Sequence, residues 1–501
     1  MNKIKNQYLF KALISLITII ALFACTKAKS PSPELTVSAS TLTFAPEGGS
    51  QDITITSNAD WSVINPGLSW LQLSSTSGKG GSTIIHVTAI SPNGTGATQS
   101  AILTISSSNG QARRVMVTQA PNLFPTYNTS PIPADAAGMN STAAQLAANI
   151  TLGYNIGNTM EAQGSETGWG NPLITQSLID LIKQSGMNAI RIPIGYDWSH
   201  IIDRKTARID PVWLARVKQV VQYCFNDNMY VVVNIHWDGG WLDCKATGAK
   251  QDSVNAKQKA YWEQIATTLR DFDEHLMFAS ANEPDAQDVA STTTLMRYHQ
   301  TFVDAVRGTG GKNAYRTLVI QAPSTSFDLA NQYFVANNTN KATQLPTDPA
   351  SHRMMIEAHY YGPPNFCILN SDASWGKEWY FWGANLHTKN PLFVNRNSLP
   401  STEEHYVDSI LNTAKVNFAS KGIPIVMGEY GTSYHADKLK GYPQDSLLSV
   451  NSQMHFYRYL TQQARANGVL PFLWGSDVID RSNNTVGDQR TLDSLRKGAG
   501  F

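Results

Sequence analysis

From about residue 136 to the C-terminus, short apolar runs alternate with longer stretches whose apolar residues recur at helical spacing. Eight apolar runs have the length of buried strands: 152–156, 189–194, 230–235, 276–279, 317–320, 354–359, 423–427 and 470–474. Helices are expected between them, for example at 211–225, 256–272, 402–418 and 451–466. Asp210 precedes Pro211 and suits a helix N-cap. Eight strands that alternate with helices predict an α/β chain folded as a (β/α)8 barrel, the TIM barrel.

Residues 34–120 follow a different pattern, rich in Ser, Thr, Gly, Val and Ile, with short runs in which apolar and polar positions alternate. The alternating runs are 42–44, 52–56, 84–88, 101–105 and 114–118. A period of two between turn residues predicts β-strands, and several short strands predict a small all-β, immunoglobulin-like sandwich. Residues 121–135 contain four prolines and are predicted to form a stiff linker, so that the barrel domain spans 136–501.

The N-terminus is predicted to be an export signal. Lysines at positions 3, 5 and 11 precede an apolar run at 12–24, which is too short to span a bilayer. Leu22-Phe23-Ala24-Cys25 resembles a bacterial lipobox, in which the signal (1–24) is cleaved and the cysteine is acylated. We therefore expect an exported lipoprotein, tethered by residues 25–33 to a membrane, the outer membrane if the cell is Gram-negative. The alternative is ordinary secretion with an incidental cysteine.

Six of the predicted barrel strands carry or end in polar or aromatic side chains. These side chains are Arg191, His236, the pair Asn282 and Glu283, His359 with Tyr361, Glu429 and Trp474. In a barrel the C-terminal strand ends converge on one face, where active sites form. Taken singly, such residues have ordinary structural explanations: an arginine in a strand often belongs to an ion pair of the core, and a glutamate before proline is usually a loop residue. Together they predict one pocket, since burying so many polar groups without a role costs free energy.

Two of these residues, Glu283 and Glu429, are carboxylates at the ends of the fourth and seventh strands. Paired carboxylates across a sugar-sized gap cleave glycosidic bonds. A separation of about 5–5.5 Å indicates retention of the anomeric configuration, and a wider one indicates inversion. This chemistry requires neither a metal nor a cofactor, and we predict neither.

Residues from about 140 to 500 resemble glycoside hydrolase family 5, most closely its subfamily 4. The motifs are Gly153-Tyr154-Asn155-Ile156-Gly157-Asn158-Thr159, Thr167-Gly168-Trp169-Gly170-Asn171-Pro172, Arg191-Ile192-Pro193, Asn234-Ile235-His236-Trp237, Asn282-Glu283-Pro284, His359-Tyr360-Tyr361 and Gly428-Glu429-Tyr430-Gly431. Asn-Glu-Pro alone is moderately specific, but the whole set in this order is strongly so. The resemblance implies a (β/α)8 fold and a retaining endo-β-1,4-glucanase.

The resemblance also assigns roles to the two carboxylates and their neighbours. Glu283 matches the general acid/base, and Asn282 beside it is expected to bond the sugar 2-OH. Glu429 matches the nucleophile that forms a glycosyl-enzyme intermediate. Arg191 and Tyr361 are expected to favour and orient the carboxylate of Glu429.

Further residues are expected to contact the substrate. His236 and His359 would touch the sugar and orient the carboxylates, and Trp474 would be the sugar platform where the bond is cleaved. Asn155 is expected to touch a sugar hydroxyl. Trp237 stands where the subfamily commonly has a second histidine and is expected to line the cleft.

Residues 34–120 resemble the BACON domains that precede glycan-degrading modules in some bacterial proteins. The motifs are Ala59-Asp60-Trp61-Ser62-Val63, Trp70-Leu71, Gly78-Lys79-Gly80-Gly81 and Val117-Thr118-Gln119-Ala120. That family's name implies carbohydrate binding. We favour a spacer with Trp61 and Trp70 in its core, because the sequence contains no row of aromatic residues that would form a sugar platform.

The partner is predicted to be a β-linked plant polysaccharide, but the preferred one stays open among cellulose-type glucan, xyloglucan, mixed-linkage glucan and glucomannan. One alternative is a β-mannanase, and another is a cell-surface glycan-binding lipoprotein without catalysis. The presence of both Glu283 and Glu429 argues against the latter. The chain has 39 Lys and Arg against 38 Asp and Glu, which argues against nucleic-acid binding. We expect a monomer, and a disulfide between Cys244 and Cys367 stays open.

Overall fold

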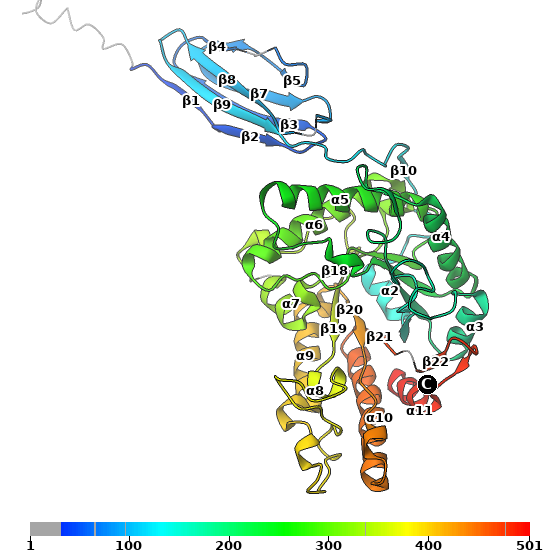
Figure 1. Ribbon diagram of the computed structural model, residues 1–501. Helices are drawn as coiled ribbons and strands as arrows, with labels where there is room; N and C mark the ends of the chain where they lie inside the picture. The colour runs from blue at the N-terminus through cyan, green and yellow to red at the C-terminus, as the bar shows by residue number, and fades with distance from the viewer. Residues whose placement is uncertain (1–31, 65–66, 96, 336, 476) are drawn as a thin grey trace, which may run out of the picture. The chain divides into compact units, whose positions relative to one another are not determined.

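A computed structural model describes residues 32–501 except 65, 66, 96, 336 and 476. The chain divides into two compact units, Met1–Leu123 and Phe124–Phe501 (Figure 1). The predicted signal peptide and Cys25 lie outside the described residues. No helix within the described residues has the length and apolar character needed to cross a bilayer.

The first unit is a sandwich of two sheets, as predicted. One sheet has the order β1 (Leu35–Val37), β3 (Gly49–Ser57), β7 (Gly81–Ala89) and β5 (Leu71–Leu73). The other has the order β2 (Thr41–Phe44), β9 (Ala112–Gln119), β8 (Gln99–Ser107), β4 (Trp61–Ile64) and β6 (Ser77–Gly78). Alternate residues of the long strands face inward and are buried, which is why the period of two was informative.

The aromatic residues of this sandwich belong to its core. Phe44, Trp61 and Trp70 are all buried, and the described residues 32–123 contain no other Phe, Trp or Tyr. The sandwich therefore presents no exposed aromatic ring in its described part, in keeping with the expected core role of Trp61 and Trp70.

The second unit is a closed barrel of eight parallel strands in chain order. They are β11 (Gly153–Asn155), β12 (Ala189–Ile194), β15 (Tyr230–Ile235), β16 (Leu276–Ala279), β18 (Leu318–Gln321), β19 (Met354–Tyr360), β20 (Ile425–Tyr430) and β21 (Val469–Leu473). Pairing of β21 with β11 closes the barrel. Each strand overlaps a predicted one. Their residues are nearly all buried because helices cover the outside and side chains fill the inside.

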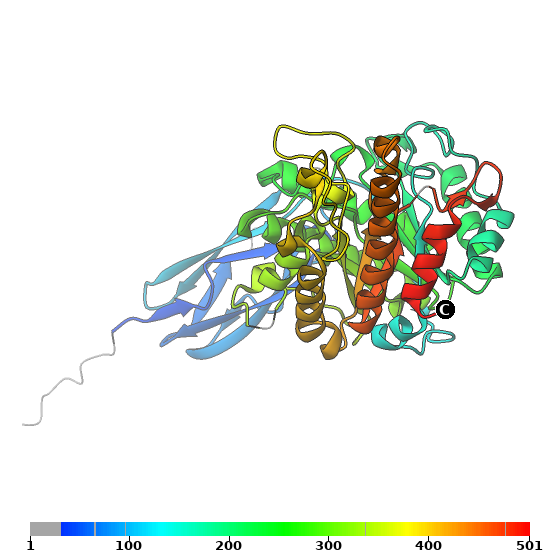
Figure 2. The ribbon, with the colours of Figure 1, turned by 90° about the horizontal axis from the view of Figure 1, so that it is seen from below.

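Helices surround the barrel, and Figure 2 shows α10 between α9 and α11. The helices are α2 (Ala143–Asn149), α3 (Gln176–Gln184), α4 (Pro211–Asn226), α5 (Gly248–Thr268), α6 (Val289–Gly308), α7 (Phe327–Tyr333), α8 (Pro364–Cys367), α9 (Glu404–Asn417), α10 (Pro443–Ala466) and α11 (Gln489–Ala499). The predicted cap of α4 is confirmed, since Asp210 accepts a hydrogen bond from Val212 N at 2.9 Å. Short antiparallel pairs β13 (Ile201–Asp203) with β14 (Arg208–Ile209) and β22 (Ile479–Asp480) with β23 (Thr485–Val486) decorate the loops.

Most of the predicted linker 121–135 belongs to the barrel unit, which begins at Phe124. The backbone N–H groups of Tyr127 and Asn128 donate to Glu263 Oε2 of α5 at 2.6 and 3.2 Å. Strand β10 (Ile132–Ala134) pairs with β17 (Gly310–Gly311). The prolines and polar residues of this segment do not reveal its partners, since those lie more than a hundred residues away in the chain.

Candidate active site

Arg191 lies at the centre of the residues gathered by the strand ends, fully buried in β12. Its Nη1 donates to Asn155 Oδ1 at 2.9 Å and to Glu429 Oε1 at 3.0 Å. Its Nη2 donates to Asn282 Oδ1 at 2.7 Å, and its Nε lies 2.9 Å from Glu357 Oε1. One guanidinium thereby joins β11, the end of β16, β19 and β20.

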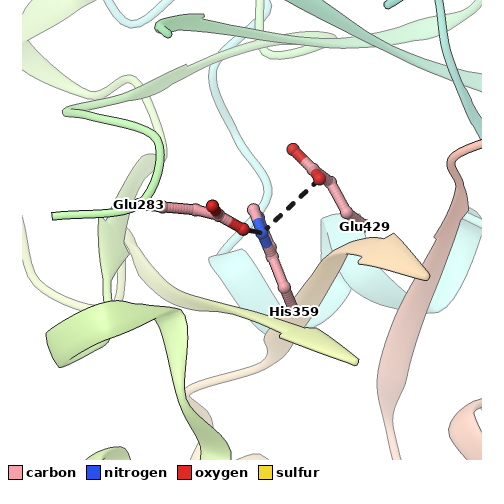
Figure 3. A group of neighbouring side chains, drawn as sticks. All are labelled: Glu283, His359 and Glu429. Atoms are coloured by element: carbon pink, nitrogen blue, oxygen red, sulfur yellow. Dashed lines mark hydrogen bonds and ion pairs between the residues drawn. The ribbon is translucent and has the colours of Figure 1, made fainter. Parts of the chain in front are cut away.

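His359 lies between the two predicted catalytic carboxylates (Figure 3). Its Nδ1 is 2.7 Å from Glu283 Oε1 and 3.7 Å from Glu429 Oε2. The three groups bring one nitrogen and two oxygens within 4.8 Å of one another. The nearest oxygens of Glu283 and Glu429 are therefore separated by no more than 4.8 Å.

The charges around His359 favour its protonated form. Burial alone lowers the pKa of His359, but the charge of Glu429 and the hydrogen bonds to Glu283 and Glu357 raise it to about 9. The hydrogen bond from His359 in turn lowers the pKa of Glu283, although burial opposes this. Glu283 and His359 therefore share one proton at neutral pH, and it lies on His359. Because that proton occupies the gap between the carboxylates, a divalent cation would have to displace it to bind there.

Both oxygens of Glu429 are held in place. Arg191 contacts Oε1, and the hydroxyl of Tyr361 donates to Oε2 at 3.0 Å. Burial and the charge of Glu429 hold the pKa of Tyr361 well above its usual range, so its hydroxyl stays a donor. The side chain of Glu429 is only 7% exposed, whereas that of Glu283 is 50% exposed. The site thus pairs an enclosed carboxylate with one that faces solvent.

Trp474 and His236 form an aromatic wall of the site. Their rings are parallel within 5°, with centroids 5.8 Å apart. Burial lowers the pKa of His236 to about 3, so this histidine is neutral, unlike His359. The Trp474 ring packs directly on the backbone of Gly157, where a Cβ would overlap the ring. Gly157 is therefore required for this position of the ring.

A cavity lies beside Glu283, which is one of its lining residues. Its lining includes Trp237, Trp241, Lys245 and Asp285. Trp237 is 58% exposed and contacts Trp198 edge-on at a centroid distance of 5.1 Å. Trp237, which is predicted to line the cleft, is thus among the residues that line the cavity beside Glu283.

Two features of the site differ from the sequence prediction. Asn155 is buried, and its Nδ2 donates to Gly428 O at 2.8 Å while its Oδ1 accepts from Arg191. It therefore positions Arg191 and does not face a sugar hydroxyl. The prediction also missed Glu357, a fully buried carboxylate in contact with Arg191 and His359. The signal was present, because the period of two in a strand places Glu357 on the same face as His359.

Comparisons with known proteins agree with this geometry. The family model described as cellulase (glycosyl hydrolase family 5) matches residues 154–477, and the BACON model, described as a putative N-terminal binding domain, matches 59–120. A xyloglucan-specific endo-β-1,4-glucanase of Bacteroides ovatus is 30% identical over 478 residues, covering 91% of this chain and 89% of its own. Endoglucanase A of Paenibacillus barcinonensis is 33% identical, covering 73% of this chain and 92% of its own.

Solved structures give the same result. The Bacteroides ovatus GH5 xyloglucanase in complex with a XXXG heptasaccharide has a TM-score of 0.67 and 29% identity, covering 94% of this chain and 100% of that one. A GH5 xyloglucan-specific β-1,4-glucanase from a ruminal metagenomic library, in complex with XXLG, has a TM-score of 0.63 and 35% identity. It covers 72% of this chain and 96% of that one.

Proposed function

The chain belongs to glycosyl hydrolase family 5, and we propose that it is a retaining endo-β-1,4-glucanase with Glu283 as acid/base and Glu429 as nucleophile. The observation that carries this proposal is the pair of carboxylates whose oxygens lie within 4.8 Å of each other. Retaining enzymes place their carboxyl groups about 5–5.5 Å apart, whereas inverting enzymes leave about 6.5–9.5 Å for a water molecule. The short separation favours direct attack by Glu429.

In the first step a carboxylate oxygen of Glu429 bonds to the anomeric carbon, and the bond to the leaving sugar oxygen breaks. Arg191 and Tyr361 hold the two oxygens of Glu429 and orient it for this attack. The leaving oxygen takes a proton from Glu283. A sugar bound in the cleft would bury the half-exposed Glu283, and burial raises the pKa of a carboxyl. The proton held by His359 would then move to Glu283, where the reaction needs it.

In the second step Glu283, now a carboxylate, takes a proton from water while the water oxygen bonds to the anomeric carbon. Glu429 leaves as a carboxylate, so the configuration inverted once is inverted again. Asn282 accepts from Arg191 through Oδ1, and its Nδ2 is the atom that we propose donates to the sugar 2-OH. Trp474 provides the apolar face against which the sugar ring stacks.

Among β-glucans, xyloglucan is the substrate we propose. The support is the relative that covers 91% of this chain, a xyloglucan-specific enzyme, together with the similar structures solved with xyloglucan oligosaccharides. Mixed-linkage glucan, glucomannan and cellulose-type glucan are the competing substrates, and mannan would indicate the β-mannanase alternative.

The test is to incubate the purified chain with xyloglucan, barley mixed-linkage glucan, carboxymethylcellulose, glucomannan and mannan, alongside Glu283→Gln and Glu429→Ala. We expect reducing ends from xyloglucan and a loss of at least about a thousandfold in Glu429→Ala. Azide, a small nucleophile, should restore turnover in Glu429→Ala and yield a glycosyl azide of inverted configuration. Binding of polysaccharide without turnover by the unaltered chain would exclude the enzymatic function.

We also propose that the chain is exported and anchored as a lipoprotein through Cys25, that the sandwich acts as a spacer, and that the protein is a monomer. The support for the anchor is the sequence of residues 1–25. Cys25→Ser should abolish acylation and shift the protein from the membrane fraction to a soluble one. An unchanged membrane fraction would contradict the anchor, and a dimer mass in light scattering would contradict the monomer.

A further inference from the structure

Glu357 is a charged group that the proposed reaction does not use. It lies in β19 with no exposed surface, two residues before His359. Gln321 Nε2 of β18 donates to its Oε2 at 2.8 Å. Its Oε1 lies 2.9 Å from Arg191 Nε and 3.2 Å from His359 Nε2. Burying a carboxylate without partners costs free energy. Gln321, Arg191 and His359 therefore stabilise the charge of Glu357 at this buried position.

The neighbouring strand leaves room for this carboxylate. The register between β19 and β20 shifts after Ala358, and Gly428 lies at that irregularity. A Cβ on Gly428 would overlap the carboxyl group of Glu357. The residue directly before Glu429 is therefore a glycine whose side-chain space is occupied by Glu357.

We propose that Glu357 is a positioning residue for the reaction proposed above: it keeps His359 doubly protonated and directs the Nδ1–H of His359 at Glu283 and Glu429. The geometry supports this because Glu357 faces the opposite ring nitrogen, Nε2. A neutral imidazole carries a hydrogen on only one nitrogen, whereas an imidazolium donates from both. With carboxylates at both nitrogens, the ring is held as an imidazolium in one orientation.

The surrounding charges leave this role to Glu357. Arg191 is the other cation that faces it, and Glu429 and Glu283 are the other anions near His359. Tyr361 and Gln321 are neutral, and burial keeps His236 neutral. Burial opposes ionisation of Glu357, but Arg191 and His359 hold its pKa below the usual range. Removing the charge of Glu357 would leave two anions, Glu283 and Glu429, beside the two cations Arg191 and His359. The proton that His359 shares with Glu283 would then be bound less tightly.

The test is the pH profile of kcat/KM for Glu357→Gln, a change that keeps the shape and removes the charge. The alkaline limb should move to lower pH by about 1–3 pH units, the usual effect of a nearby opposite charge on a pKa. At a pH above the shifted alkaline limb, kcat of Glu357→Gln should be lower than that of the unaltered chain, by roughly tenfold for each pH unit by which the limb moves. KM should be nearly unchanged, because Glu357 does not reach the cleft. Glu263→Gln, which alters a buried carboxylate of α5, is the control and should keep the original profile.

Two outcomes would overturn the proposal without contradicting the proposed function. The first is an active Glu357→Gln enzyme whose pH profile matches that of the unaltered chain. If the variant does not fold, ¹⁵N NMR of the histidines in the unaltered chain decides instead, with His359 assigned by loss of its signal in His359→Gln. Two protonated ring nitrogens at pH 7 support the proposal, and a single one overturns it. If the unaltered chain cleaves no β-glucan, the proposed function itself fails.

Discussion

Arg191 shows how the site depends on individual residues, because each of its nitrogens contacts a side chain from another part of the barrel. Arg191→Met would remove one of the two cations that face the buried carboxylates Glu357 and Glu429 and leave only His359 beside them. Breaking one buried ion pair costs about 3–5 kcal/mol, so the midpoint of urea unfolding should fall clearly. Arg204→Met removes an exposed arginine and is the control, with a midpoint expected to change little. Equal midpoints for the two variants would contradict a structural role of Arg191.

Tyr361 tests the orientation of the nucleophile. Tyr361→Phe removes the donor to Glu429 Oε2 while keeping the ring. A hydrogen bond to a charged group contributes about 1.5–3 kcal/mol, so kcat/KM for xyloglucan should fall roughly 10- to 100-fold. The loss should lie mainly in kcat. A change confined to KM would show that Tyr361 binds sugar and does not position Glu429.

His359 predicts a pH dependence of stability. Its pKa is about 9 in the folded protein against an ordinary value of 6.5. A raised histidine pKa stabilises the fold fully below about pH 6.5, and the contribution is lost as pH rises through about 9. The free energy of unfolding should therefore decline by a few kcal/mol between these values, since one pKa unit corresponds to about 1.4 kcal/mol. Calorimetry at several pH values should show this decline, and His359→Gln should reduce it.

At the residue scale the sequence allowed prediction of the side chains that end strands, because the barrel brings those ends together. It did not reveal what each buried polar atom contacts. Asn155 was expected at a sugar and instead holds Arg191. Glu357 was missed: the period of two places it on the same face as His359, but a lone acid within an apolar strand does not show which side chains it contacts across the barrel.

At the scale of elements, the eight barrel strands were predictable because both of their faces are buried and their sequences are continuously apolar. Two helix starts were not. Helix α5 begins at Gly248 and α10 at Pro443, each about two turns before its predicted start. The first turns of α5 are mostly polar, so apolar spacing does not mark them. The start of a helix whose first turns are polar is recognised from its N-cap contacts, and the sequence shows these contacts only in part.

The loop after β11 allows a test at this scale. Gly157→Ala would push the Trp474 ring from its place, because the added Cβ overlaps the ring. We expect kcat/KM for xyloglucan to fall by roughly tenfold through a higher KM, with a nearly unchanged melting temperature, since stacking of one sugar contributes about 1 kcal/mol or more. Gly94→Ala, where a Cβ meets open space in the sandwich, is the control. An unchanged KM would exclude Trp474 as the platform.

At the scale of the whole molecule, the division into two units was predictable from the change in periodicity, and it falls within the predicted linker 121–135. The contacts that most of this linker makes with the barrel were not predictable. Residues 124–135 have the composition of a linker and the contacts of a structural segment. Two kinds of contact place the boundary before this segment. Glu263 accepts a hydrogen bond from the backbone of Tyr127, and the side chains of Phe124 and Tyr127 pack on the barrel core.

Two truncations test this boundary. A chain that starts at Phe124 should melt at the same temperature as the barrel transition of the full chain. A chain that starts at Ala136 should be less stable by several kcal/mol, because Glu263 loses its backbone donors while it stays buried. Scanning calorimetry would measure both. Equal melting temperatures would mean that residues 124–135 act only as a connection.

The charged network around Arg191 is carried by the strands and their ends, whereas Trp237 and much of the wall of the neighbouring cavity lie on loops. If the proposed function holds, we expect the strands to determine the reaction and the loops to determine which sugar is preferred. A laboratory library that randomises residues 237–245 while keeping the strands should yield many clones that still turn over and differ in which polysaccharide they prefer.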